Sequence, residues 1–355
     1  MQDFVTYQGF RFHSLWLRDN CPCSECRHEN GQRLHETWKL PADIKIENSV
    51  ASDDTLTVYW AEPYPHKATF SHAFLVNNAY DKAPAIQSDK VLWGGGFDLP
   101  NFEYEQVLAD DKQRFLWLNA VAKYGVTKLS GVPDEAGMIL KVVDLFGFVR
   151  ETNYGTIFEV RTEENPQNLA YTPLPLSLHT DNPYRDPVPT LQLLHCLKQA
   201  LQGGVTALVD GFKAAEILRK EDPEAFELLS TEAVSFRFNS DDANLNFSGQ
   251  MISTTPQGEI TNIRINNRSC APFNIAFDKM EHYYRAYQAL MSIVQSERCK
   301  TTLKLQEGEL LLFDNERVMH GREVQAIGTR HLQGCYADKD SLLSTVALLN
   351  TQTES

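Results

Sequence analysis

Alternating apolar and polar positions predict β-strands through much of the chain. The segment 55–60 (TLTVYW) repeats with a period of two, which places alternate side chains on opposite faces of a strand. The segments 124–129, 189–196 and 309–313 are further strand-like apolar runs. Glycine-containing turns at 203–204, 257–258 and 307–308 divide the second half of the chain. The pattern therefore predicts a mainly β protein.

Apolar residues spaced three and four apart predict a smaller number of helices. They recur in this way over 102–124, and further helices are expected at about 135–146, at roughly 279–295 and, in a short form, at 70–78. We interpret the three tyrosines between 283 and 287 as packing residues. Beyond 146, strands should predominate, with the helix at 279–295 as the interruption. The expected fold class is thus mainly β with flanking helices.

A cluster of cysteines marks the N-terminal region as a separate unit. Cys21, Cys23 and Cys26 form a Cys-x-Cys-x-x-Cys pattern, which places three thiolates in one loop, where zinc needs a fourth ligand. The candidates for that ligand are His28, His35, His66 and His72. The alternative is three free cysteines with ordinary packing. We predict a small β-rich zinc-binding domain over 1–85, a glycine-rich connector over 86–100 and a catalytic domain over 101–355.

Composition narrows the classes of protein that fit. The 355 residues are 42% hydrophobic and 23% charged, as in globular proteins, and no run of eighteen apolar residues predicts a membrane span. The formal net charge of −14 argues against a nucleic-acid or anionic-membrane partner. An odd number of cysteines, seven, does not suggest a disulfide framework. No leader-like pattern opens the chain, so we expect a cytoplasmic protein.

One short motif suggests a metal centre in the second domain. His179 and Asp181 form the only His-x-Asp in the sequence, and on an extended chain both side chains point to the same face. A second histidine would complete the two-His, one-carboxylate triad that binds Fe(II) and leaves coordination positions open. His320 follows an apolar strand and is the natural candidate, and Arg330, ten residues later, could bind a carboxylate. The alternatives are a surface turn for the motif and a core histidine at 320.

Taken together, these segments resemble the γ-butyrobetaine dioxygenase family of Fe(II)/2-oxoglutarate oxygenases. The resemblance also covers relatives that act on trimethyllysine and on 2-(trimethylammonio)ethylphosphonate. The segments that carry it are 16–23 (WLRDNCPC), 178–181 (LHTD), 192–196 (QLLHC), 203–204 with 209–212, 320–322 (HGR) and 330–336. The resemblance implies a double-stranded β-helix (jelly roll) for the catalytic domain, and a homodimer.

The resemblance also assigns ligands for the metals and the cosubstrate. It implies His179, Asp181 and His320 for Fe(II), with O2 as the second cosubstrate and ascorbate as a further candidate cofactor. It implies Arg330 for the distal carboxylate of 2-oxoglutarate, with Leu194 in that pocket and Thr206 as a weaker contact. For zinc, it implies Cys21, Cys23, Cys26 and His66, which is preferred over His72.

The substrate expected from the resemblance is a small trimethylammonium zwitterion, first γ-butyrobetaine, which is hydroxylated to L-carnitine. The family positions that surround its cation correspond here to Tyr154, Phe158, Tyr171, Asn182 and Tyr336. Phe158 stands in place of Trp and Asn182 in place of Tyr, so a thinner aromatic cage is expected. The alternative for each ring is a place in the core.

The anionic end of the substrate is expected at Asn168, Asn266 and Asn267. Arg268 comes next, and it would suit a dianion unless it points to solvent, which makes 2-(trimethylammonio)ethylphosphonate the alternative substrate. Trimethyllysine ranks third, because no acceptor for its amino group is evident. A non-catalytic binding protein is disfavoured, because neither the iron triad nor Arg330 is lost.

Overall fold

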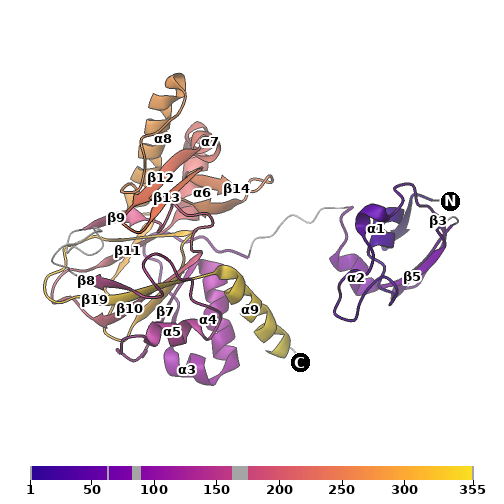
Figure 1. Ribbon diagram of the computed structural model, residues 1–355, viewed down its shortest axis with the longest axis horizontal. Coiled ribbons are helices and arrows are strands. Elements are labelled where there is room, and N and C mark those ends of the chain that lie inside the picture. Colours follow the sequence, from indigo (N-terminus) through magenta and orange to yellow (C-terminus); the bar gives the residue numbers. More distant parts are fainter. Residues whose placement is uncertain (1, 62–63, 82–88, 162–174, 354–355) are drawn as a thin grey trace. The chain divides into compact units, whose positions relative to one another are not determined.

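The computed structural model describes residues 2–61, 64–81, 89–161 and 175–353. Its elements are drawn in Figure 1, and contacts divide the chain into two compact units, Met1–Ser88 and Asp89–Ser355. The first unit contains the cysteine cluster, and the second contains the His-x-Asp motif together with His320. Among the described residues, no helix has both the length and the apolar character needed to cross a membrane.

The first unit is built from short strands around a small core. A hairpin of β1 (Phe4–Tyr7) and β2 (Phe10–His13) turns at Gln8 and Gly9, whose φ angles of 50° and 83° are those of a tight hairpin turn. An antiparallel sheet follows, in the order β3 (Ile46–Ala51), β4 (Thr55–Trp60), β5 (His66–Ser71). Helices α1 (Ser14–Asp19), η1 (Thr37–Lys39) and α2 (His72–Asn77) complete the unit.

Strand β4 shows why this unit folds as it does. Its burial alternates from residue to residue, and Leu56, Val58 and Trp60 lie in the core. Two of the cysteines, Cys21 and Cys26, are buried in the same core. The predicted helix at 70–78 begins two residues later, at His72, because β5 continues to Ser71 and the Ser71 side chain accepts a hydrogen bond from the Phe74 N–H as the helix cap.

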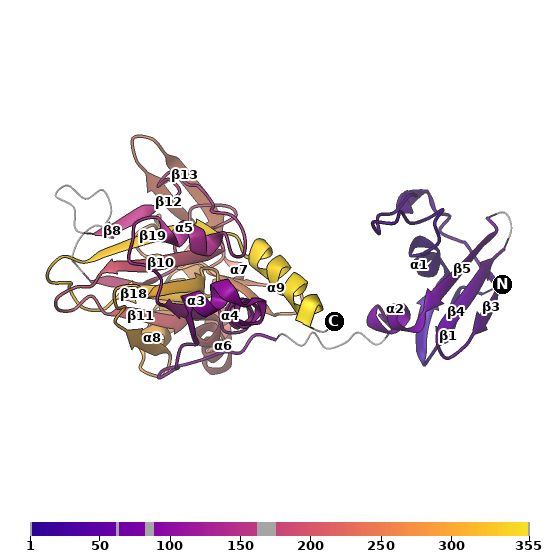
Figure 2. The same cartoon turned by 90° about the horizontal axis from the view of Figure 1, so that it is seen from below.

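The second unit contains two antiparallel sheets of a jelly roll. The larger has the order β6 (Asn101–Glu103), β7 (Val126–Ser130), β17 (Leu310–Asp314), β10 (Leu191–Lys198), β19 (His331–Ala337), β8 (Phe158–Arg161), with β6 and β7 parallel. The smaller has the order β16 (Lys300–Leu303), β11 (Thr206–Asp210), β18 (Val318–Arg322), β9 (Leu176–His179). Two separate two-stranded sheets follow β11 in sequence, β12 (Val234–Asn239) with β13 (Asn244–Gly249) and β14 (Ile252–Thr254) with β15 (Ile260–Ile263). Figure 2 shows the β12–β13 hairpin projecting beyond the two larger sheets.

Helices cover the outer faces of these sheets. On one side lie α3 (Tyr104–Ala109), α4 (Asp111–Tyr124), α5 (Met138–Val143) and α9 (Lys339–Thr353). On the other lie α6 (Gly211–Glu221), α7 (Pro223–Thr231) and α8 (Phe277–Gln295). Alternate side chains of β10 point to opposite faces of the larger sheet, one covered by helices and the other facing the smaller sheet. Its Leu191 and Leu193 pack with the helices, while Leu194 and Cys196 face the interior between the sheets.

The helix predictions were partly wrong. The helix predicted over 102–124 is two helices, α3 and α4, because Asp110 has extended backbone and caps α4 by accepting from Lys112 N–H. The single interruption predicted after 146 is α8, but α6, α7 and α9 are present as well. Asp222 followed by Pro223 is a recognisable helix start, with the aspartate as N-cap and the proline at the first helical position. That signal would have found α7.

Candidate functional site

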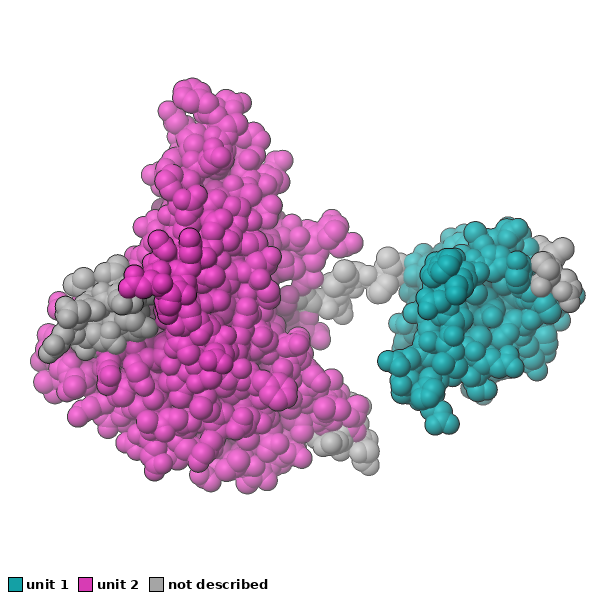
Figure 3. Space-filling model, in the orientation of Figure 1, with its two compact units in different colours: residues 1–88 teal, residues 89–355 magenta. Residues whose placement is uncertain are grey.

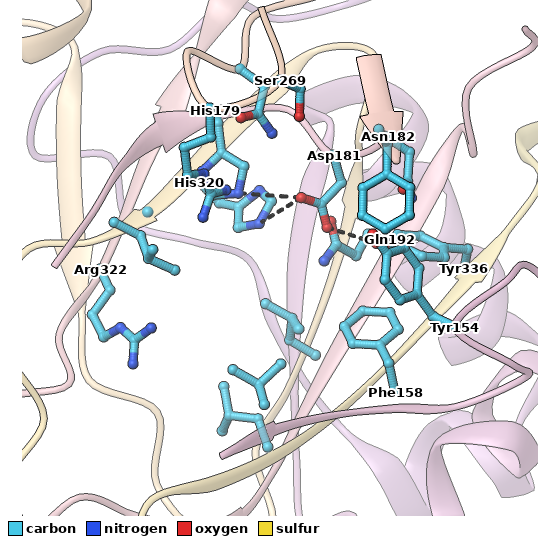
Figure 4. A pocket seen from close by; sticks show the side chains of 18 of the residues that line it. Tyr154, Phe158, His179, Asp181, Asn182, Gln192, Ser269, His320, Arg322 and Tyr336 are labelled. Carbon is cyan, nitrogen blue, oxygen red and sulfur yellow. Dashed lines mark hydrogen bonds and ion pairs between the residues drawn. The ribbon is translucent and has the colours of Figure 1, made fainter. Parts of the chain in front are cut away.

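Two neighbouring strands bring the His-x-Asp motif and His320 together. Strand β9 pairs with β18 in a register that places His179 opposite His320. The Nε2 atom of His179 lies 3.2 Å from Oδ1 of Asp181, and the Nε2 atom of His320 lies 4.0 Å from the same oxygen. The candidate ligand atoms of all three residues lie within 4.8 Å of one another. Figure 4 shows the two imidazoles directed toward the Asp181 carboxylate. The sequence prediction that these residues share a site agrees with this placement.

The protonation of the three side chains suits metal binding. The Nδ1 atom of His179 lies 2.7 Å from the carbonyl oxygen of Ser177, which can only accept, so Nδ1 carries the proton and Nε2 has a free lone pair. Burial, helped by the nearby His179, lowers the pKa of His320 to about 3 and keeps its ring neutral. Burial alone would raise the pKa of Asp181, but its hydrogen bonds and the two histidines hold that pKa well below its usual range. The Tyr336 hydroxyl also donates to Oδ2 of Asp181, at 2.8 Å. Two imidazoles and one carboxylate match the donor set of Fe(II).

Asn315, which sequence reasoning missed, holds the main chain of Asp181. Its Oδ1 accepts from the Asp181 N–H at 2.7 Å, and its Nδ2 donates to the Asp181 carbonyl at 3.0 Å and to the Pro189 carbonyl at 2.9 Å. Asn315 is 1% exposed and lies in the turn between β17 and β18, directly before the strand that carries His320. One side chain therefore sets the position of Asp181 relative to the strand of the second histidine.

We expect Asn315→Ala to lower the affinity for Fe(II) by about 10- to 100-fold, because residues that orient metal ligands typically contribute that much. Calorimetric titration of the protein with Co(II) measures the effect without turnover, and circular dichroism checks the fold. Asn101→Ala, at an exposed position on β6, is the matched control and should leave the affinity unchanged. An Asn315→Ala protein that binds Co(II) as the wild type does would contradict this role.

A single cavity of about 440 Å³ opens onto the three side chains. Arg330, Leu194 and Thr206 line it, as expected from the sequence, and so does Arg322, which lies opposite Thr206 in the strand register and was not expected. Burial lowers the pKa of Arg322 to about 10 and lowers that of Arg330, but both arginines stay charged at neutral pH. Gly204 makes room here, since a Cβ atom would lie 3.2 Å from Cδ of Arg330. This end of the cavity suits a dicarboxylate.

The other end of the cavity is aromatic. Tyr154, Phe158 and Tyr336 line it beside Asn182, and Figure 4 shows these four on the side of Asp181 away from Arg322. Of the described residues that line the cavity, Asp181 is the only carboxylate. Six further polar or aromatic residues line the cavity, and sequence reasoning missed them as site residues: Tyr184, Gln192, Arg237, Phe238, Asn239 and Ser269.

Only some of the residues expected at the anionic end of the substrate line the cavity. Asn266 and Arg268 line the cavity, so Arg268 does not simply point away from the site. Asn267 differs from the expectation, because it is exposed and lies outside the cavity lining, whereas the buried Asn266 donates to the Thr180 carbonyl. The predicted positions Asn168 and Tyr171 lie outside the described residues.

The first unit, teal in Figure 3, brings the predicted zinc ligands together. The Nε2 atom of His66 lies 3.1 Å from Sγ of Cys21 and 3.6 Å from Sγ of both Cys23 and Cys26. The four ligand atoms lie within 4.8 Å of one another, and none of these cysteines is in a disulfide. His72 is directed elsewhere, with Nδ1 3.5 Å from the Tyr7 hydroxyl. Three thiols and one imidazole form a closed donor set that fits structural zinc.

Comparisons with known proteins agree with the two units. The model of the taurine catabolism dioxygenase TauD, TfdA family matches residues 88–336, and that of the γ-butyrobetaine hydroxylase-like N-terminal domain matches residues 3–76. γ-Butyrobetaine dioxygenase of Pseudomonas sp. (strain AK-1) is 38% identical, over 95% of this chain and 90% of its own. The Homo sapiens γ-butyrobetaine dioxygenase is 31% identical, over 97% of this chain and 92% of its own. The Homo sapiens mitochondrial trimethyllysine dioxygenase is 32% identical, over 96% of this chain and 83% of its own.

Solved structures support the fold of the larger unit. An asparagine oxygenase solved with Fe(II), 3-hydroxyasparagine and succinate has a TM-score of 0.50 and 16% identity, over 61% of this chain and 74% of its own. A taurine dioxygenase from Burkholderia xenovorans has a TM-score of 0.50 and 13% identity, over 70% and 89%. The jelly-roll architecture predicted from the sequence is thereby confirmed.

Proposed function

The chain belongs to the γ-butyrobetaine dioxygenase family of Fe(II)- and 2-oxoglutarate-dependent oxygenases, and on this premise we propose that it hydroxylates γ-butyrobetaine to L-carnitine. One observation carries the proposal. A single cavity has a two-His, one-carboxylate triad between a pair of arginines and a group of aromatic rings. The arginines suit a dicarboxylate cosubstrate, and the rings suit a quaternary ammonium group, which has no N–H to donate in a hydrogen bond.

In this proposal, His179, Asp181 and His320 hold the iron, which with 2-oxoglutarate and O2 supplies an oxidant for an unactivated C–H bond. The residues of the chain position the reactants and control access to the site. Arg330 binds the distal carboxylate of 2-oxoglutarate, with Leu194 beside it. The aromatic end holds the trimethylammonium group, and the tether between that group and the substrate's anion determines which C–H bond lies nearest the iron.

Three further residues of the cavity lining favour a second substrate. Arg268 and Ser269 both line it, and Arg237 adds another guanidinium. A phosphonate carries more charge than a carboxylate and has a third oxygen that can accept hydrogen bonds. These contacts support 2-(trimethylammonio)ethylphosphonate as the alternative substrate, with the same metal, cosubstrate and aromatic residues.

The experiment that tests the proposal supplies each candidate with Fe(II), 2-oxoglutarate and O2, and measures succinate and product mass. We expect γ-butyrobetaine to give L-carnitine and succinate in equal amounts, with a higher kcat/KM than the phosphonate or trimethyllysine. Arg268→Ala should lower kcat/KM for the phosphonate by about tenfold more than for γ-butyrobetaine, because a dianion gains more from the guanidinium. If none of the three substrates stimulates succinate formation, the proposal is wrong.

We also infer a homodimer, on the family resemblance alone. Light scattering of the purified chain measures the mass in solution, and a mass near 40 kDa would identify a monomer instead.

A further inference from the structure

Asn182 begins a tight turn directly after Asp181. Asn182 has a φ of 53°, in the left-handed region that asparagine adopts more readily than most side chains. Its carbonyl accepts from the Arg185 N–H at 3.1 Å, which closes a tight turn. The side chain of residue 184 is thereby brought back to the cavity that Asp181 faces.

Hydroxyl contacts hold Tyr184 in this place. Its hydroxyl donates to Oδ1 of Asn182 at 2.7 Å and lies 2.9 Å from the Tyr154 hydroxyl. The single proton of Tyr184 is used in the bond to the amide oxygen, so Tyr154 is the donor in the second contact. Tyr184 is 6% exposed, and burial raises the pKa of its hydroxyl, which therefore stays protonated.

The ring of Tyr184 is part of a larger aromatic arrangement. It stacks on Phe238 of β12, with 5.1 Å between ring centroids and 25° between ring planes. Phe238 in turn meets Tyr154 edge-on at 5.7 Å, and Phe158 packs on Tyr336 at 5.0 Å. All five rings line the cavity. Tyr184 and Phe238 thus add two rings to Tyr154, Phe158 and Tyr336, the three expected rings that lie among the described residues.

From these contacts we propose that Tyr184 and Phe238 form the wall of the cation site that residue 182 was expected to form. Asn182 is a positioning residue that holds Tyr184. The inference rests on the proposed function in taking the ligand to be a trimethylammonium zwitterion. The attraction is between π faces and a quaternary cation, to which a phenol or a phenyl ring contributes and an aliphatic side chain does not.

Anaerobic calorimetry tests the inference separately from turnover. The protein, loaded with Fe(II) and 2-oxoglutarate without O2, is titrated with γ-butyrobetaine and with 5,5-dimethylhexanoate, an isostere in which a neutral tert-butyl group replaces the trimethylammonium group. The ratio of the two dissociation constants measures preference for the cation and cancels most effects on packing. We expect Tyr184→Leu to lower this preference about tenfold and Phe238→Leu about threefold, as for the loss of one cation–π contact.

Matched variants separate the ring from the hydroxyl. Tyr184→Phe keeps the ring and its stacking on Phe238 and should retain most of the preference, while the part that is lost measures how far the hydroxyl bond to Asn182 positions the ring. Tyr284→Leu, at an exposed tyrosine of α8 outside the cavity lining, should also retain it. If Tyr184→Leu does not fold, Phe238→Leu alone decides. A wild-type protein without preference for the cation, or leucine variants with the wild-type preference, would overturn the inference. Preferential binding without hydroxylation would contradict the proposed function and leave the cation site standing.

Discussion

Asp181→Ala is expected to lower kcat/KM by at least about 1000-fold, which corresponds to ~4 kcal/mol of transition-state stabilisation. Asp181 is the only carboxylate among the three candidate iron ligands, and its removal leaves two imidazoles. Two ligands hold Fe(II) more weakly than three and no longer fix which positions stay open. The Tyr336 hydroxyl also loses its acceptor, so the geometry of the site changes along with its charge.

Succinate formation in the presence of substrate measures the loss, and iron content after desalting shows whether the metal is still bound. Circular dichroism should show an intact fold, because the apolar cores between each of the two sheets and its covering helices are unaffected. Asp241→Ala, at an exposed aspartate between β12 and β13, is the matched control. A variant at position 181 that retained a tenth of the wild-type activity would exclude Asp181 as an iron ligand.

His66→Ala is expected to remove zinc from the first unit and to lower its unfolding temperature by more than about 10 °C, since each kcal/mol shifts a domain of this size by about 4–8 °C. Cys21 and Cys26 lie within the unit's core, so a bound metal there contributes directly to folding. Without the metal, the buried thiols have no ligand bond, and only the packing of the short strands and helices stabilises the unit.

His72→Ala provides a close control. His72 is the histidine over which His66 was preferred as the fourth ligand. Its Nδ1 contacts the Tyr7 hydroxyl, so its removal should leave zinc bound. Elemental analysis gives zinc per chain, and differential scanning calorimetry resolves the transition of each unit. Full zinc content in His66→Ala, or its loss in His72→Ala, would reassign the fourth ligand.

The iron-site residues could be predicted from the sequence because local geometry determines most of the arrangement. A His-x-Asp at the end of a strand places two ligands on one face, and an apolar strand such as β17 leads to the third. The apolar run of 189–196 likewise identifies β10, whose first six residues are all buried. Such inferences need only a strand and its direction.

The residues that were missed depend on contacts between distant segments. Asn315 is a polar residue in a turn, and nothing in its neighbourhood shows that its amide reaches residues 181 and 189. Phe238 comes from a hairpin whose approach to the cavity depends on how the helices after β11 pack. At position 182, the sequence showed that a ring was absent but not that Tyr184 could supply one.

The hairpin β12–β13 pairs with neither of the two larger sheets, although it contributes Arg237, Phe238 and Asn239 to the cavity. The strands that carry the metal ligands therefore do not depend on its backbone for their register. Insertions, deletions and substitutions in the hairpin can change which molecule is accepted without displacing the iron. We expect the sequence of this hairpin to vary among members of the family. Exchanging the hairpin between relatives should transfer substrate selectivity and leave the hydroxylation chemistry unchanged.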